Sequence, residues 1–218
     1  MSSGRVLRQM KYLAALACLA WFPVVAISTI PAAAAPPELD IPVVCELGRD
    51  CFIQFYVDRD ASTGVADHHC AGLTYDGHKG TDFRLIELPA MQRGVIVRAA
   101  ATGTVRAIRD GEDDLGVGKN ERPAAGREAG NAVVLVHGDG WETKYSHMTK
   151  GSVNIVKGQR VVAGEALDLI GLSGNSTFPH LDFSVRHDGD IVDPFSGAAA
   201  SEPCDVKRAP LWSVATNK

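Results

Sequence analysis

Short apolar runs alternate with glycines and polar turns along most of this chain. They predict one strand at 52–57 and a regular series from residue 94 onward, at 95–99, 104–109, 132–137, 141–148, 160–163, 166–172, 181–186 and 191–192. No stretch has the 3.6-residue period of an amphipathic helix. The pattern therefore predicts an all-β domain.

Two connections add to this picture. The residues His137-Gly138-Asp139-Gly140 end one predicted strand and start the next, as a tight hairpin requires. Residues 110–130 are charged, glycine-rich and without periodicity, which indicates a long surface loop of the kind that often serves function.

A weak internal repeat links 95–105 with 156–167. Both stretches resemble the hairpin motif of lipoyl- and biotinyl-type barrels, which favours a barrel-sandwich (duplicated hybrid motif) topology. The second stretch has Ala163-Gly164 at its tip, where a swinging-arm carrier needs a lysine, which argues against a carrier function.

The N-terminal 34 residues have the order of a secretory signal peptide. Arg5, Arg8 and Lys11 precede an apolar stretch at 12–30 and an alanine run. The alternative is an uncleaved membrane anchor, but Pro23 and the Ala-x-Ala run favour cleavage. We expect a signal at 1–34, a linker and strand at 35–76, a main domain at 77–196 and a tail at 197–218. The mature protein is then exported, periplasmic or extracellular, without stable membrane insertion.

Charge and cysteines narrow the class further. Removing the three basic residues of the signal changes the formal net charge from −4 to −7. No basic stripe for nucleic acid remains. An even number of mature cysteines in an exported chain indicates disulfides. Of the three pairings we prefer Cys45 with Cys51 and Cys70 with Cys204, while a thiol-ligated zinc site is the disfavoured alternative.

Candidate chemistry gathers in three short polar segments at the ends of apolar runs. In the first, His78 and Asp82 are four residues apart across Gly80, whose freedom lets both side chains converge on one ion. In the second, at 179–183, His180 and Asp182 share one strand face by the two-residue period, opposite Leu181 and Phe183.

The third polar segment, at 145–148, contains His147. Strand alternation places His147 on the same face as Tyr145, which makes Tyr145 a candidate groove residue or a core aromatic. Each segment alone is typical of a solvated turn or a wet sheet face. Together the three predict a metal site.

An ordered series of motifs resembles the lysostaphin-type (LytM-like) zinc endopeptidases of peptidoglycan. The series is Gly77-His78-x-Gly80-x-Asp82, His137-Gly138-Asp139-Gly140-Trp141, Tyr145-Ser146-His147, Gly158-x-x-Val161, Gly164-x-x-Leu167, Gly171-x-Ser173-Gly174 and Pro179-His180-Leu181-x-Phe183. The resemblance implies a small, mostly antiparallel β domain with one zinc ion in a groove between long loops, the loop at 110–130 forming one wall.

Carried over by position, the resemblance implies that His78 and Asp82 bind zinc and that His147 and His180 assist catalysis. The family's third ligand is a histidine, and here Asp182 occupies its place. Two carboxylates neutralise a divalent ion, which weakens it as a Lewis acid and favours harder ions such as manganese. His68 and His69 are the other histidines that could substitute.

The resemblance implies metal-assisted hydrolysis of peptide bonds in peptidoglycan, in which the ion polarises the carbonyl and acidifies a water while an imidazole takes the proton. The alternative is a catalytically impaired relative that binds the cell wall or regulates other hydrolases. Asp182 is the feature that raises this alternative. The retention of His78, Asp82, His147 and His180 favours the enzyme.

Overall fold

The computed structural model describes Met1 and residues 35–117 and 123–213. The signal-peptide prediction at 1–34 therefore falls outside the described residues, apart from Met1. Among the residues that are described, no helix is long and apolar enough to span a bilayer.

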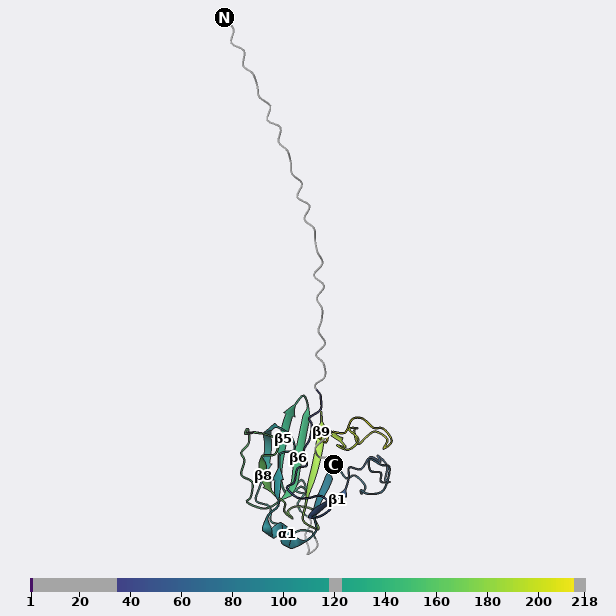
Figure 1. Ribbon diagram of the computed structural model, residues 1–218, viewed down its shortest axis with the longest axis vertical. Coiled ribbons are helices and arrows are strands. Elements are labelled where there is room, and N and C mark those ends of the chain that lie inside the picture. The colour runs from purple at the N-terminus through teal and green to yellow at the C-terminus, as the bar shows by residue number, and fades with distance from the viewer. Residues whose placement is uncertain (2–34, 118–122, 214–218) are drawn as a thin grey trace. The chain divides into compact units, whose positions relative to one another are not determined.

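The regular secondary structure of the described residues is almost entirely β, which confirms the all-β prediction (Figure 1). The strands are β1 (Cys51–Phe55), β2 (Thr81–Leu85), β3 (Ile96–Arg98), β4 (Gly103–Arg109), β5 (Asn131–Gly138), β6 (Trp141–Met148), β7 (Arg160–Val161), β8 (Ala166–Leu169), β9 (His180–His187) and β10 (Asp190–Val192). One short helix of six residues, α1 (Leu88–Arg93), lies between β2 and β3.

The strands form two antiparallel sheets. The larger has the order β1-β2-β9-β6-β5-β4-β7, with β10 paired to β9, and the smaller contains β3 and β8. In Figure 1, β5, β6 and β9 lie side by side across the domain. The large sheet does not close on itself, so the barrel-sandwich prediction holds as two packed sheets and not as a closed barrel.

The hydrophobic core lies on one face of the large sheet. Phe83, Tyr145, Leu181 and Phe183 are fully buried there, together with residues of the small sheet. Because side chains alternate along a strand, the residues between them point to the opposite face. The prediction that Leu181 and Phe183 lie on the face opposite Asp182 is thus confirmed. The outer face of the sheet remains available for polar groups.

Sequence patterning missed two elements. The strand β2 contains Thr81, Asp82 and Arg84, so it resembles a polar turn although Phe83 and Leu85 are core residues. The helix α1 has a proline at its start and ends at Gly94, and its six residues are too few to show a helical period.

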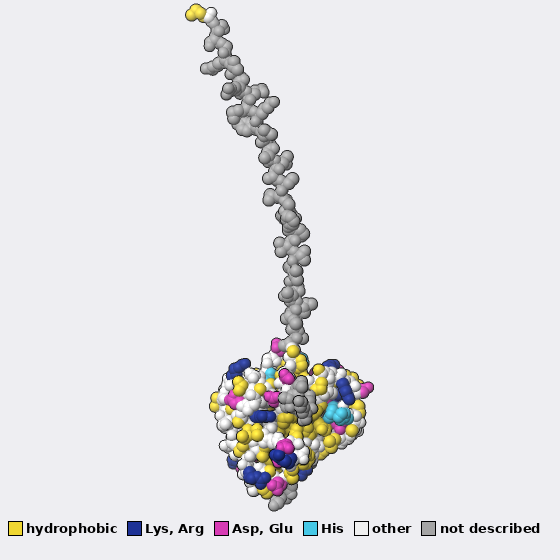
Figure 2. All heavy atoms as spheres, in the orientation of Figure 1, with side chains coloured by type: hydrophobic (Ala, Val, Ile, Leu, Met, Phe, Trp, Pro, Cys, Tyr) yellow, Lys and Arg dark blue, Asp and Glu magenta, His cyan; other side chains and the backbone are white. Residues whose placement is uncertain are grey.

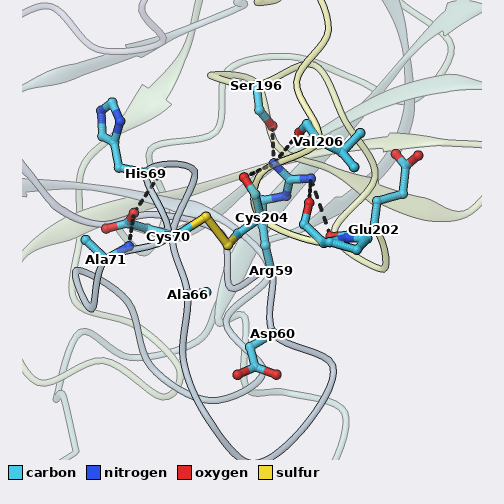
Figure 3. The surroundings of a disulfide bond; sticks show 12 residues. Arg59, Asp60, Ala66, His69, Cys70, Ala71, Ser196, Glu202, Cys204 and Val206 are labelled. Carbon is cyan, nitrogen blue, oxygen red and sulfur yellow. Dashed lines mark hydrogen bonds between the residues drawn. A yellow bond between two sulfur atoms is a disulfide. The ribbon is translucent and has the colours of Figure 1, made fainter.

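Both preferred disulfides are present, Cys45–Cys51 and Cys70–Cys204. The second joins positions 134 residues apart in the sequence. Beside it, the buried guanidinium of Arg59 donates hydrogen bonds to the Ser196 hydroxyl and to backbone carbonyls of the 202–206 segment (Figure 3). These contacts attach the C-terminal segment to the stretch that leads into His78.

Charged side chains of both signs are interspersed on the face shown in Figure 2. On that face, the described residues form no stripe of a single charge.

Candidate metal centre

Asp82 and Asp182 are direct partners across the antiparallel pair β2 and β9. Their side chains therefore share the outer face of the sheet. Carboxylate oxygens of both residues and a ring nitrogen of His78 all lie within 4.8 Å of one another. The sequence prediction that these three residues come together is consistent with this geometry.

Backbone carbonyls orient the three buried histidines of this region. The Nδ1 atom of His78 lies 2.8 Å from the Tyr56 carbonyl oxygen, and that of His147 lies 2.8 Å from the Ser173 carbonyl oxygen. The Nδ1 atom of His180 lies 2.9 Å from the Phe178 carbonyl oxygen and 3.1 Å from the Ser176 hydroxyl. Because a carbonyl only accepts, Nδ1 of each ring donates, and in the neutral ring Nε2 is the bare nitrogen.

A cation fits between His78 and Asp82. The Nε2 atom of His78 lies 3.1 Å from Oδ1 of Asp82, and with Nδ1 protonated both atoms of this pair are acceptors in the neutral ring. Burial is the largest influence on the pKa of His78 and acts to lower it, but the hydrogen bond and charge of Asp82, with the charge of Asp182, raise the pKa above its ordinary value. The site thus favours a positive charge here, either a proton or a metal ion.

Two unsatisfied atoms support the same interpretation. Oδ1 of Asp182 is buried and has no hydrogen-bond partner among the described residues, and neither does Oγ of Ser146, which lies opposite Asp182 on β6. A Cβ atom at Gly80 would collide with the Asp182 carboxylate and would lie 3.1 Å from the Phe183 carbonyl oxygen. Glycine at position 80 therefore leaves this carboxylate its place. The ring nitrogen of His78 and the carboxylate oxygens of Asp82 and Asp182 suit a divalent cation that accepts nitrogen and oxygen ligands.

His147 reaches this face through a β-bulge. The pairing of β5 with β6 shifts register between Val133 and Asn131, and His147 has a φ of 65°. Strict alternation would place His147 beside Tyr145 in the core, whereas the bulge turns its ring to within 4.7 Å of the His180 ring, centroid to centroid. The prediction that His147 and Tyr145 share a face is therefore wrong.

The environments of His147 and His180 differ. Burial, followed by the neighbouring His180, lowers the pKa of His147 to about 4. His147 is therefore neutral at pH 7. The Nε2 atom of His180 lies 3.7 Å from Oδ1 of Asp82, so His180 lies at the edge of the ligand cluster.

Beside the cluster lies a cavity of about 220 Å³ lined by Phe55, Tyr75, Asp82, Val117, His147, Asn175, Ser176, Thr177, Phe178, His180 and Asp182. Val117 comes from the long loop, in agreement with the prediction that this loop borders the groove. Tyr145 is fully buried in the core, and its hydroxyl accepts a hydrogen bond from the Ala100 amide. The candidate groove role of Tyr145 is therefore wrong.

The aromatic lining of the cavity was not predicted. Tyr75 stacks on His78 with ring centroids 4.3 Å apart, Phe55 meets Tyr75 edge-on at 5.4 Å, and Phe178 lies 4.9 Å from His180. Tyr75 and Phe178 each lie within three residues of a predicted site histidine, which is the signal that could have marked them. Phe55 carried no such signal.

The other histidines lie elsewhere. His68 stacks on Phe195 with ring centroids 4.8 Å apart and contacts His69, so neither replaces Asp182. His187 stacks on Trp141, and His137 lies beside the Thr102 carbonyl and the Thr143 hydroxyl. A second cavity, of about 390 Å³, lies between the Cys45 loop and α1 and contains none of the predicted site residues.

Comparison with known proteins places this site within a family. The model of peptidase family M23 matches residues 76–194. The chain belongs to peptidase family M23. The matched region contains all five predicted site residues, namely His78, Asp82, His147, His180 and Asp182.

Individual relatives are more distant. The chain is 33% identical to the peptidoglycan DD-endopeptidase ShyA of Vibrio cholerae over 108 residues, which are 50% of this chain and 20% of ShyA. It is 32% identical to the DD-carboxypeptidase/endopeptidase Mpg of Neisseria meningitidis serogroup B over 127 residues, 57% of this chain and 24% of Mpg. The chain thus matches about a quarter or less of the length of these two relatives.

A solved structure with the same fold is that of the SpoIIQ–SpoIIIAH pore-forming complex. The similarity has a TM-score of 0.51 at 17% identity and covers 76% of this chain and 94% of the compared chain. At this identity the similarity concerns the fold alone.

Proposed function

We propose that this chain is an exported, metal-dependent endopeptidase that cleaves peptide bonds of peptidoglycan. The observation that carries the proposal is the register of Asp82 with Asp182 beside a histidine whose free nitrogen faces them. Membership of peptidase family M23 and similarity to relatives named as peptidoglycan endopeptidases supply the reaction class. The two disulfides support export, because such bonds persist in oxidising compartments.

His78, Asp82 and Asp182 are the residues that would hold the ion. A divalent ion, zinc in the family and manganese as the alternative that two carboxylates allow, would supply Lewis acidity at the scissile carbonyl. His147 and His180 border the cavity with their Nδ1 atoms anchored. Their bare Nε2 atoms are therefore free to accept a proton from water, and a ring that has taken this proton can donate a hydrogen bond to the oxygen of a tetrahedral intermediate.

The cavity beside these groups suits an extended peptide. Phe55, Tyr75 and Phe178 border it with apolar surface, and Asn175 and Thr177 add polar groups. Closely spaced aromatic rings offer contact area while losing little conformational entropy on binding.

The test combines metal content with hydrolysis. The purified full chain should contain close to one divalent ion and release cross-linked peptides from isolated peptidoglycan. Asp82→Asn should lose both properties, and the exposed Asp190→Asn should lose neither. A protein that takes up no zinc, manganese or iron on titration overturns the proposal. A metal-loaded protein that binds peptidoglycan without cleaving it supports the regulator or wall-binding alternative instead.

A further inference from the structure

An arginine lies on the same sheet face as the candidate metal centre, one row of side chains away. Arg84 pairs in register with Phe52 on β1 and with His180 on β9. The neighbouring row contains Phe55, Asp82 and Asp182. Rows on one face are two residues apart along a strand, so the two rows are separated by about 7 Å.

Aromatic rings hold this guanidinium in place. The Cζ atom of Arg84 lies 4.3 Å from the centroid of the Phe178 ring and 5.6 Å from that of the Phe52 ring. The Nη1 atom donates a hydrogen bond of 3.0 Å to Oε1 of Gln54. A guanidinium held by stacking loses little side-chain entropy when it binds a ligand.

No acidic side chain of the described residues neutralises the charge of Arg84. Within the described residues no carboxylate lies within 4.0 Å of its guanidinium, and its Nε atom is buried without a hydrogen-bond partner. By contrast, Arg93, Arg106 and Arg208 each pair with a glutamate. A half-buried, oriented and unpaired guanidinium is a binding group for a carboxylate, which it can accept in a bidentate manner.

The position of Arg84 matches the spacing of an extended peptide. Each residue of such a peptide spans about 3.3–3.6 Å, so the ~7 Å between rows corresponds to about two residues. Phe178 connects the two rows, because its ring borders the cavity and also contacts the guanidinium.

We propose that Arg84 forms a subsite that recognises a free carboxylate of the peptide substrate about two residues from the scissile bond. This proposal rests on the proposed function and narrows its substrate class to peptides with a carboxylate at that distance. Arg84 here determines specificity and takes no part in the bond cleavage.

The test compares charged and neutral substrates. The substrates are a synthetic cross-linked stem-peptide dimer and versions in which each free carboxylate in turn is amidated. For the wild type, amidation at one position should lower kcat/KM roughly ten- to hundredfold. Arg84→Gln should lose the same factor on the free carboxylate and be insensitive to that amidation. Arg84→Lys should restore part of the discrimination, because it keeps the charge without the planar fork.

A matched control and a binding readout separate this proposal from the proposed function. Arg160→Gln removes an exposed arginine from β7, at the other edge of the sheet, and should leave the discrimination unchanged. Calorimetric binding of the same peptides is measured in parallel. If the wild type cleaves nothing yet binds the charged peptide more tightly than the amidated one, and Arg84→Gln abolishes that difference, the subsite stands while the peptidase proposal falls. If Arg84→Gln discriminates as the wild type does, in cleavage and in binding, Arg84 only packs against Phe178 and the subsite is refuted.

Discussion

Asp82 and Asp182 face each other directly across β2 and β9, and no lysine or arginine of the described chain forms an ion pair with either. Like charges in direct register destabilise a sheet, so this arrangement indicates a site built for a cation.

The first prediction concerns the opposed carboxylates in the metal-free protein. At pH 8, Asp182→Asn should raise the free energy of unfolding by ~0.5–1 kcal/mol, because one of two facing charges is removed. Added zinc should then stabilise this variant less than the wild type, since a ligand is missing. Urea unfolding with and without metal measures both effects. If Asp182→Asn destabilises the metal-free protein and binds zinc as tightly as the wild type, Asp182 is not a ligand.

A companion variant restores the ligand set implied by the family. Asp182→His should raise zinc affinity, because it restores the ligand set that the family implies and imidazole suits zinc. It should also raise the rate of hydrolysis, because the ion regains a net positive charge of one. Competition with a chromophoric chelator measures the affinity. Asp190→Asn is the control for charge alone, because Asp190 is exposed on β10. Unchanged zinc affinity in Asp182→His would mean that the carboxylate does not face the ion.

The bulge at His147 yields a second prediction. A non-glycine residue in the left-handed region costs roughly 1–2 kcal/mol, so His147→Gly should be more stable than His147→Ala by about 1 kcal/mol. Both variants lack the imidazole and should lose hydrolysis to the same extent. Thermal denaturation of the pair measures the difference. Equal stabilities would show that the bulge relaxes once the imidazole is removed.

The third prediction is a pH dependence that arises from Asp168. Burial, joined by the charges of Asp110 and Asp114, raises the pKa of Asp168 to about 7, although the amide of Leu169 opposes this. Its Oδ2 atom is buried without a hydrogen-bond partner among the described residues. The folded state therefore keeps a proton that the unfolded chain releases near pH 4.

The free energy of unfolding should therefore fall as the pH rises through this range. The stability contributed by protonated Asp168 is complete below about pH 4 and is lost as the pH rises to about 7, by roughly 4 kcal/mol at most. Asp168→Asn should remove this loss, so the variant should exceed the wild type in stability at pH 8 by more than at pH 4. Chemical denaturation at the two pH values measures the difference. A stability difference that is the same at both would show that Asp168 is charged in the folded protein.

The fourth prediction concerns the long-range disulfide. Replacing Cys70 and Cys204 by serine opens a loop of 134 residues, which should cost ~5 kcal/mol by loop entropy, against ~2 kcal/mol for Cys45 and Cys51, which are six residues apart. The Cys70–Cys204 variant should also bind metal more weakly, because the segment before His78 loses its covalent link to the C-terminal segment and is held there by the Arg59 hydrogen bonds (Figure 3). Urea unfolding and metal titration of the two double variants measure these effects. Equal losses of stability and metal affinity in both would contradict the prediction.

The linear sequence determined most of the strands and the types of polar side chain at their ends. Alternation along 141–148 and 181–186 predicted β6 and β9 because one face of each strand supplies apolar side chains to the core and the other is mostly polar. Glycines in the hairpin at 137–140 have positive φ values that few other residues adopt, so the sequence predicted this turn as well. The disulfide preference was also correct.

Only the tertiary structure decided how these residues meet. The register that sets Asp82 against Asp182 depends on the pairing of strands about 100 residues apart, which no local pattern encodes. The orientation of His147 depends on a bulge, since one extra residue overrides the alternation on which the prediction relied. Strand β2 and the cavity-lining Phe55 were missed for a related reason, because the sides that their side chains face are fixed by packing between distant segments.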